Sequence, residues 1–228
     1  MPGFNLFNIQ APLHPNLMGR WLFNDSVVDA SGKGHDATLV GTTSYVAGNR
    51  GNALQCTSGL TGYATVADHT DLTPNTVTVC AWVKLRTDNG VANDIISRTT
   101  DAAGYPAYFI VISAGALIVQ TMAVVNTSPL TLAVGEATGF TTGTWHHIAG
   151  TYDGTSVKTY LNGTLGSTVG SVSGNITYNA SYPVAFASAI GSSNYRSTDA
   201  DIDDAQIYNI ALPQSEIVRI MNGYTPLQ

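Results

Sequence analysis

Residues 145–163 read WHHIAGTYDGTSVKTYLNG, and this stretch decides the fold class. Two runs rich in Thr, Tyr, Ile and Val, residues typical of β-strands, end at Asp153-Gly154 and Asn162-Gly163. Asp-Gly and Asn-Gly pairs supply the positive backbone φ angles that tight hairpin turns require. The stretch therefore predicts a meander of at least three antiparallel strands.

Short β-rich runs alternate with turn clusters from residue 20 onward, the spacing of an all-β sandwich. The expected strands are Gly19–Phe23, Ala53–Cys56, Tyr63–Val66, Val77–Lys84, Asp94–Ser97, Ala107–Ser113, Ala116–Thr121, Trp145–Tyr152, Ser156–Leu161, Val184–Ile190 and Ala200–Tyr208. One helix is expected at Pro213–Met221, because proline is favoured in a first helical turn and Glu216 suits the N-terminal dipole. Ile217, Ile220 and Met221 would form its apolar face.

The composition limits the class of protein. The chain has 228 residues, enough for one large sandwich with its own core. It carries 9 Lys and Arg against 15 Asp and Glu, and the net charge of −6 disfavours nucleic acid as a partner. Because 44% of the residues are apolar, intrinsic disorder is excluded. No run approaches the roughly 20 apolar residues of a spanning helix, so no membrane partner is expected.

Residues 1–16 differ from the rest and are expected to form an extended arm before one domain over residues 17–228. The apolar side chains of the arm are interrupted by Asn, Pro and Gly, too often for a core helix. They include Phe4, Leu6, Phe7 and Ile9. Either the domain itself or a partner subunit would hold such an arm.

The N-terminus has no basic region and no continuous apolar run of the kind that a signal peptide has, so synthesis in a cytoplasm is expected. The only two cysteines are Cys56 and Cys80, and both fall on expected buried strands. In a reducing compartment such thiols are expected to be free.

Several short motifs follow one another along the chain in a fixed order. They are RWLFND (20–25), DASGKGHDATL (29–39), GNAL (51–54), VCAWVK (79–84), IIS (95–97), WHHIAGTYDG (145–154), YLNG (160–163) and IDDAQIYNIAL (202–212). Together they resemble the laminin-G-like, concanavalin A-like jelly-roll domains, over about residues 17–222. The resemblance implies a two-sheet antiparallel jelly-roll sandwich with one short C-terminal helix, and core aromatics at Trp21 and Trp82. Cys56 departs from the pattern, since an aromatic is usual there, and residues 117–140 do not align.

Catalytic residues are not expected. Glycosidases on this type of sandwich use two carboxylates, usually glutamates, and this chain has only Glu136 and Glu216. Glu216 has a capping role in the expected helix, and Glu136 lies in a Gly-rich stretch. His146 and His147 are consecutive on a strand, so their rings point to opposite faces and cannot share one ion. We expect one of them inside the sandwich and one outside.

An acidic run near the C-terminus is a candidate metal-binding site. It consists of Asp199, Asp201, Asp203 and Asp204. On a strand the first three share one face and Asp204 takes the other, so like charges would repel unless they are compensated. Carboxylate oxygens suit Ca²⁺. The resembled family often holds a structural calcium between the loop after the first strand and this strand. That implies the ligands Asp29, Asp203, Asp204 and Asp25. The alternative is a solvated acidic edge that discourages strand addition.

Aromatic and amide side chains occur together in the loops before and after residue 184. They are Tyr178, Tyr182, Tyr195 and Asn194. Loop aromatics beside amides are a common way to stack and hydrogen-bond sugar rings. Tyrosines are also common at protein interfaces, so both interpretations stay open.

Three functions are compatible with these features: a structural or adhesion protein of a larger assembly, a carbohydrate-binding module, and a hydrolase, which the missing glutamate pair disfavours. Secreted sugar-binding modules of the resembled family usually carry an export signal and a neighbouring catalytic domain, which this sequence does not show. We therefore expect the first, a bacteriophage virion component such as a capsid decoration or fibre-associated protein. It would join other subunits through the arm, as a homo-oligomer, at the virion surface. A carbohydrate-binding module is the alternative.

Overall fold

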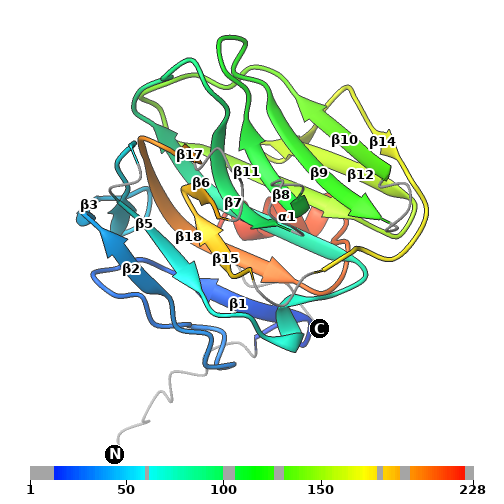
Figure 1. The fold of residues 1–228 in the computed structure, drawn as a ribbon, viewed down its shortest axis with the longest axis horizontal. Coiled ribbons are helices and arrows are strands. Elements are labelled where there is room, and N and C mark those ends of the chain that lie inside the picture. The colour runs from blue at the N-terminus through cyan, green and yellow to red at the C-terminus, as the bar shows by residue number, and fades with distance from the viewer. Residues whose placement is uncertain are drawn as a thin grey trace, which may run out of the picture.

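The computed structural model describes residues 13–59, 62–99, 106–125, 131–178, 182–190 and 196–223. Over these residues two antiparallel sheets pack face to face, with one short α-helix outside them (Figure 1), so the predicted all-β sandwich is confirmed. Several predicted functional residues lie outside the described residues: Phe4, Leu6, Phe7, Ile9, Asn194 and Tyr195.

The larger sheet has nine strands within the described residues. In spatial order, seven of them are β13 (Thr164–Leu165), β12 (Ser156–Leu161), β11 (His146–Tyr152), β6 (Val77–Leu85), β18 (Ala200–Tyr208), β4 (Asn52–Gln55) and β3 (Ser44–Ala47). In addition, β1 (Leu17–Trp21) pairs with β18, and β14 (Gly170–Ser171) pairs with β12. Three of the four aspartates of the acidic run therefore lie in a strand that has neighbours on both sides and is not a free edge, and Asp199 directly precedes that strand.

The smaller sheet has seven strands within the described residues. Their spatial order is β10 (Thr131–Ala137), β9 (Val119–Val125), β8 (Pro106–Ile112), β7 (Asn93–Thr99), β15 (Val184–Phe186), β5 (Gly62–Val66) and β2 (Thr38–Gly41). The other elements are β16 (Ser188–Ala189), β17 (Arg196–Ser197), the 3₁₀ turn η1 (Thr70–Leu72) and the helix α1 (Gln214–Met221). No helix in the described part of the chain has the length and apolarity needed to cross a membrane.

The predicted hairpin turns are confirmed. At the β12–β13 turn both Asn162 and Gly163 have positive φ, 49° and 77°, as a tight hairpin requires. At the β11–β12 turn Gly154 has φ 98°, and a carboxylate oxygen of Asp153 accepts hydrogen bonds from the backbone of the next strand. Local sequence therefore sets the register of the meander.

One large apolar core lies between the sheets. Trp21 is fully buried there, with its ring 5.0 Å from Phe186, so its predicted core role is confirmed. A second apolar cluster lies on the outer face of the larger sheet, where α1 covers Cys80, Tyr160 and Tyr208. The helix begins after Pro213 and buries Ile217 and Ile220, as its sequence predicts.

Both cysteines are free and buried, which confirms the prediction from the sequence. Burial raises the pKa of the Cys56 thiol to about 12. It raises the pKa of the Cys80 thiol as well. A thiol that stays protonated at neutral pH is a poor nucleophile, so both cysteines act as small apolar side chains.

Two predictions about aromatic and histidine side chains were wrong. Trp82 is only half-buried and lies on the outer face of the larger sheet, because strand alternation turns Val83 and Ala81 inward instead. His146 and His147 do point to opposite faces, yet both are buried. Neither histidine lies outside as expected for one of the pair: His147 is 1% exposed, since the Trp82 ring packs against it at 5.5 Å.

Candidate functional site

The loop after β1 is organised around Asp29. Its carboxylate accepts hydrogen bonds from the backbone N of Arg20 (2.9 Å), Ser31 (2.8 Å) and His35 (3.0 Å) and from the Ser31 hydroxyl (2.7 Å). Burial raises the pKa of Asp29, but these hydrogen bonds outweigh it and hold the pKa below its ordinary value. Asp29 is therefore a charged anchor for the loop, with donors on both oxygens.

The acidic strand β18 is neutralised by cations. Lys84 Nζ lies 2.7 Å from Asp201, and Arg86 pairs with both Asp199 and Asp201. Arg20 Nε donates to Asp204 at 2.8 Å, and Arg50 lies 3.4 Å from the same carboxylate. Four of the nine basic residues of the chain thus serve this strand. These basic side chains offset the repulsion between the aspartates, the role for which the sequence suggested a metal ion.

A β-bulge shifts the register of β18 between Asp203 and Gln206, and Asp204 within it has a φ of 46°. Because of the bulge, the strict alternation expected for Asp203 and Asp204 does not hold: Arg50 contacts both, through its backbone N at 2.7 Å from Asp203 and its guanidinium near Asp204. Burial raises the pKa of Asp203 to about 6, although the backbone hydrogen bond from Arg50 acts against this rise.

These contacts do not fit a calcium ion held by the four predicted aspartates. Asp29 and Asp204 already accept from N–H and hydroxyl donors, and Asp25 accepts from the Asn52 side chain at 2.7 Å. Among the described residues, the four carboxylates form no group of three that could converge on one ion. Calcium binding stays a prediction, and no step of the function proposed below depends on it.

The two glutamates lie on different elements and have different structural roles. Glu136 is on β10, where it accepts a hydrogen bond from the Gln120 side chain at 2.6 Å. Glu216 is in the first turn of α1 and lies 3.5 Å from Arg219. Each has a structural partner, so neither forms the facing carboxylate pair of a glycosidase.

The structure describes two of the four residues predicted to bind sugar. Tyr178 is half-buried, its hydroxyl donates to the Pro74 carbonyl at 2.6 Å, and its ring lies under the Arg98 guanidinium at 5.3 Å. Its ring and hydroxyl therefore serve packing. Tyr182 is half-buried just before β15. A sugar-binding role for the four residues stays a prediction; they are Tyr178, Tyr182, Tyr195 and Asn194.

A cleft that the sequence did not predict lies where the edges of the two sheets meet. Its volume is about 370 Å³, within the usual range of ligand pockets, and it is lined by residues 137–139, 161–162 and 164–167. We call it the edge cleft. It exists because the chain after β12 lies directly against the end of β10: Glu136 N donates to the Thr168 carbonyl at 3.0 Å. A Cβ on Gly166 would lie 1.9 Å from the Glu136 carbonyl oxygen, so only glycine permits this approach.

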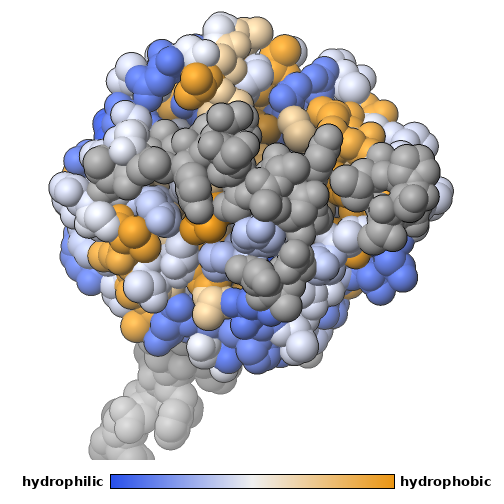
Figure 2. All heavy atoms as spheres, in the orientation of Figure 1, coloured by the Kyte–Doolittle hydropathy of each residue, from blue (hydrophilic) through white to orange (hydrophobic). Residues whose placement is uncertain are grey.

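The lining of the edge cleft contains no charged side chain. Exposed hydroxyls come from Thr138, Thr164 and Ser167, and the apolar part includes Leu165, which is 38% exposed. On the face seen in Figure 2, outside the grey residues, apolar residues stand in separate groups among hydrophilic ones. The surface therefore offers small apolar platforms beside hydrogen-bonding groups.

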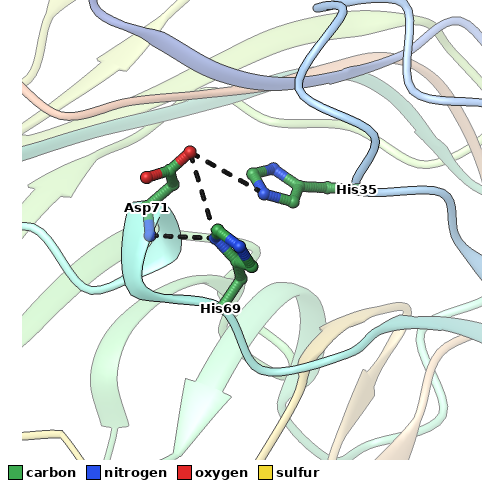
Figure 3. Close-up of side chains that lie close together, drawn as sticks. All are labelled: His35, His69 and Asp71. Carbon is green, nitrogen blue, oxygen red and sulfur yellow. Dashed lines mark hydrogen bonds and ion pairs between the residues drawn. The ribbon is translucent and has the colours of Figure 1, made fainter.

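A second feature missing from the sequence interpretation is a group of metal-ligand side chains, His35, His69 and Asp71 (Figure 3). His35 comes from the loop after β1, and the other two come from η1 and its N-cap. The spacing His69-Thr70-Asp71 was the only local signal, because the fold alone brings His35 to it.

Comparison with known families shows where the chain belongs. The family model described as the concanavalin A-like lectin/glucanases superfamily matches residues 57–218, more than half of the chain. No relative is found among curated protein sequences.

Solved structures with the same fold include domain 4 of AbnA, an extracellular arabinanase of Geobacillus stearothermophilus, in complex with arabinotriose. It is 21% identical with a TM-score of 0.68, over 90% of this chain and 98% of that chain. The binding domain of Paraclostridial Mosquitocidal Protein 1 is 16% identical (TM-score 0.69), and a botulinum neurotoxin type C structure, described as dependent on two ganglioside molecules for cell entry, is 14% identical (TM-score 0.67). Each is matched over 91% of this chain, which spans about half the length of either toxin chain.

Proposed function

Since the chain belongs to the concanavalin A-like lectin/glucanases superfamily, we propose that it is a non-catalytic glycan-binding domain that takes a neutral oligosaccharide in the edge cleft. The observation that carries this proposal is the lining of the cleft: exposed hydroxyls around an exposed leucine, with no charged side chain. A sugar ring has one apolar C–H face and a rim of hydroxyl groups. Leu165 would contact that face, and Thr138, Thr164 and Ser167 would bond the rim.

Two further observations support binding without chemistry. Glu136 and Glu216 have structural partners, so the described residues offer no facing glutamate pair for hydrolysis. The arabinanase domain that this chain matches along almost its whole length is a binding partner of arabinotriose, so a domain of this size can hold a sugar by itself. An open site of this kind usually reaches about millimolar to micromolar affinity.

The assembly function expected from the sequence depends on the arm. Residues 13–16 of the predicted arm lie against the sandwich: Leu13 packs on the cluster beneath α1, the His14 ring is 5.7 Å from Tyr208, and Asn16 accepts from Asn209 N. Residues 1–12 lie outside the described residues, so docking to other subunits, like the phage origin and the oligomeric state, stays a prediction. Display on an assembly and glycan binding are compatible roles.

A glycan array probed with the full chain tests the proposal, followed by calorimetric titration of the strongest neutral oligosaccharide. Leu165→Ser is expected to weaken binding at least about fivefold, since it removes the apolar platform. Val169→Ser is the matched control, because Val169 is 46% exposed on the same connection and does not line the cleft. It should bind within about twofold of the wild type.

Three results would contradict the proposal. Equal binding by Leu165→Ser and Val169→Ser would remove the edge cleft as the site. Loss of binding in Tyr182→Ala, with Leu165→Ser unaffected, would move the site to the predicted tyrosine loop. Release of reducing sugar from any array ligand would show catalysis.

A further inference from the structure

We propose that His35, His69 and Asp71 form a binding site for a divalent transition-metal ion, with Zn²⁺ as the first candidate. One ligand atom from each of the three side chains lies within 4.8 Å of the others. Asp71 Oδ2 is 3.9 Å from His35 Nε2 and 3.9 Å from His69 Nδ1. Figure 3 shows the carboxylate facing both rings, which approach it from two separate segments of the chain.

The orientation of His35 is the strongest evidence. Its Nδ1 lies 2.8 Å from the Met18 carbonyl oxygen, which can only accept, so in the neutral ring Nδ1 carries the proton and Nε2 has the free lone pair. Its backbone N donates to Asp29, and its carbonyl accepts from Trp21 Nε1 at 2.8 Å. A histidine whose second nitrogen bonds a backbone carbonyl is the usual arrangement of a metal ligand.

The Nε2 atom of His35 has no hydrogen-bond partner among the described residues, although the side chain is only 5% exposed. A buried polar atom without a partner is uncommon and costs about 1–3 kcal/mol. This atom points toward Asp71 and His69, so a metal ion between the three side chains would supply the missing partner.

His69 and Asp71 form the accessible side of the site. Their side chains are 52% and 37% exposed, so an ion can enter from solvent and keep a water ligand. Two imidazole nitrogens and one carboxylate oxygen suit Zn²⁺ and its neighbours and do not suit Ca²⁺ or Mg²⁺, which take oxygen ligands. Ligand atoms around a tetrahedral Zn²⁺ are about 3.3 Å apart, so the 3.9 Å separations need to shorten by little more than half an ångström. His69 Nδ1 accepts a hydrogen bond from Asp71 N at 3.2 Å in the metal-free chain, and it would give up this bond to bind the ion.

An ion at this position would join the loop after β1 to η1, two segments that lie more than 30 residues apart in the sequence. It would stabilise the native state alone, because the three ligands converge only in the folded chain. The site is separate from the edge cleft, with which it shares no residue, so the proposed glycan function does not depend on it.

The test is calorimetric titration of the full chain, stripped of metal, with ZnCl₂ at neutral pH in the presence of excess CaCl₂. We expect one equivalent to bind and the melting temperature to rise. His69→Asn should weaken binding more than about 100-fold, beyond the loss typical of an outer-shell partner. Asparagine is a good N-cap, so the metal-free variant keeps an acceptor for Asp71 N, which donates to His69 Nδ1 at 3.2 Å in the wild type.

His14→Asn is the matched control. His14 Nδ1 accepts from the backbone N two residues later at 3.1 Å, as His69 Nδ1 does, but His14 belongs to no group of metal-ligand side chains among the described residues. Its affinity for Zn²⁺ should equal that of the wild type. Co²⁺ added instead of Zn²⁺ should give the strong visible absorption of a four-coordinate ion, and His69→Asn should lose it.

Unaltered Zn²⁺ affinity in His69→Asn overturns the proposal, as does displacement of Zn²⁺ by Ca²⁺. Absence of stoichiometric binding in the folded wild-type chain also overturns it. None of these results would bear on glycan binding, which is measured separately on the full chain without added Zn²⁺.

Discussion

Replacing Asp29 by asparagine is expected to lower the free energy of unfolding by about 2 kcal/mol at pH 7. The carboxylate accepts four hydrogen bonds, two on each oxygen. An amide keeps one acceptor oxygen, and its NH₂ group is accommodated best at the Oδ2 position, where the Ser31 hydroxyl can rotate to accept from it. The backbone N–H of His35 is then left without an acceptor, and one unpaired buried donor costs about 1–3 kcal/mol. Urea unfolding of both proteins measures the difference.

The pH dependence of this difference follows from the sign of the shift. The pKa of Asp29 is lower in the folded chain than its ordinary value, so the folded state binds fewer protons than the unfolded state near pH 4. The stabilisation is complete above the unfolded pKa of about 3.9 and is lost as the pH falls through the folded pKa. The gap between wild type and Asp29→Asn should therefore narrow in acid.

Asp36→Asn is the control, because Asp36 is exposed and accepts one hydrogen bond, from Asp29 N at 2.8 Å, which an amide oxygen can also accept. Its effect should stay within about 0.5 kcal/mol. A loss below about 1 kcal/mol in Asp29→Asn would refute the reasoning. The loss should be the same with Ca²⁺ and with chelator. A loss seen only with Ca²⁺ would make Asp29 a calcium ligand, as the family resemblance implied.

Three other results are expected. Burial raises the pKa of Asp203 to about 6, so between about pH 4 and 6 the folded state binds more protons than the unfolded state, and its stability falls as the pH rises through that window. Asp203→Asn should therefore be up to about 3 kcal/mol more stable than the wild type at pH 8 by urea unfolding. A variant less stable than the wild type at pH 8 would contradict this. Gly166→Ala places a Cβ against the Glu136 carbonyl oxygen and should lower both the melting temperature and the affinity for glycan. Unchanged values of both would show that the backbone at the edge of the cleft can shift at no cost. Deleting residues 1–12 should leave thermal unfolding by circular dichroism unchanged, whereas deleting residues 1–16 should lower the melting temperature, and equal curves for both deletions would show that residues 13–16 contribute nothing.

Local chemistry explains why much of the fold could be predicted from the sequence. The turn pairs at Asp153 and Asn162 act through the backbone of two residues each, so no distant contact is needed to recognise them. Strand β10 was missed for the opposite reason. Its glycine, Gly135, reads as a loop residue, but a Cβ there would lie 2.7 Å from the Val157 carbonyl oxygen in the other sheet. Strands β2 and β3 are mostly exposed and lack the apolar alternation of a half-buried strand.

The candidate sites were harder to predict because their residues meet only through the topology. The pairing of Lys84 with Asp201 follows from the register between β6 and β18, which no local pattern reveals. From the sequence alone, the acidic run therefore suggests either a metal ion or a solvated edge, and the pairing with cations from other strands stays hidden. His35 and His69 likewise come together through two loops, and the edge cleft arises from backbone approach at Gly166.

The central position of β18 has a consequence for synthesis. This strand joins β1, from the beginning of the domain, to β6 and β4, and it carries the aspartates that neutralise Arg20, Arg50, Lys84 and Arg86. Until residue 208 has left the ribosome, the larger sheet lacks its central strand. The edges of β1, β4 and β6 and the basic side chains that pair with β18 are then without their partners. We expect the domain to fold only once β18 has emerged from the ribosome, and slowly, as proteins dominated by long-range contacts do. A nascent chain shortened before β18 would expose adhesive edges and be a substrate for chaperones.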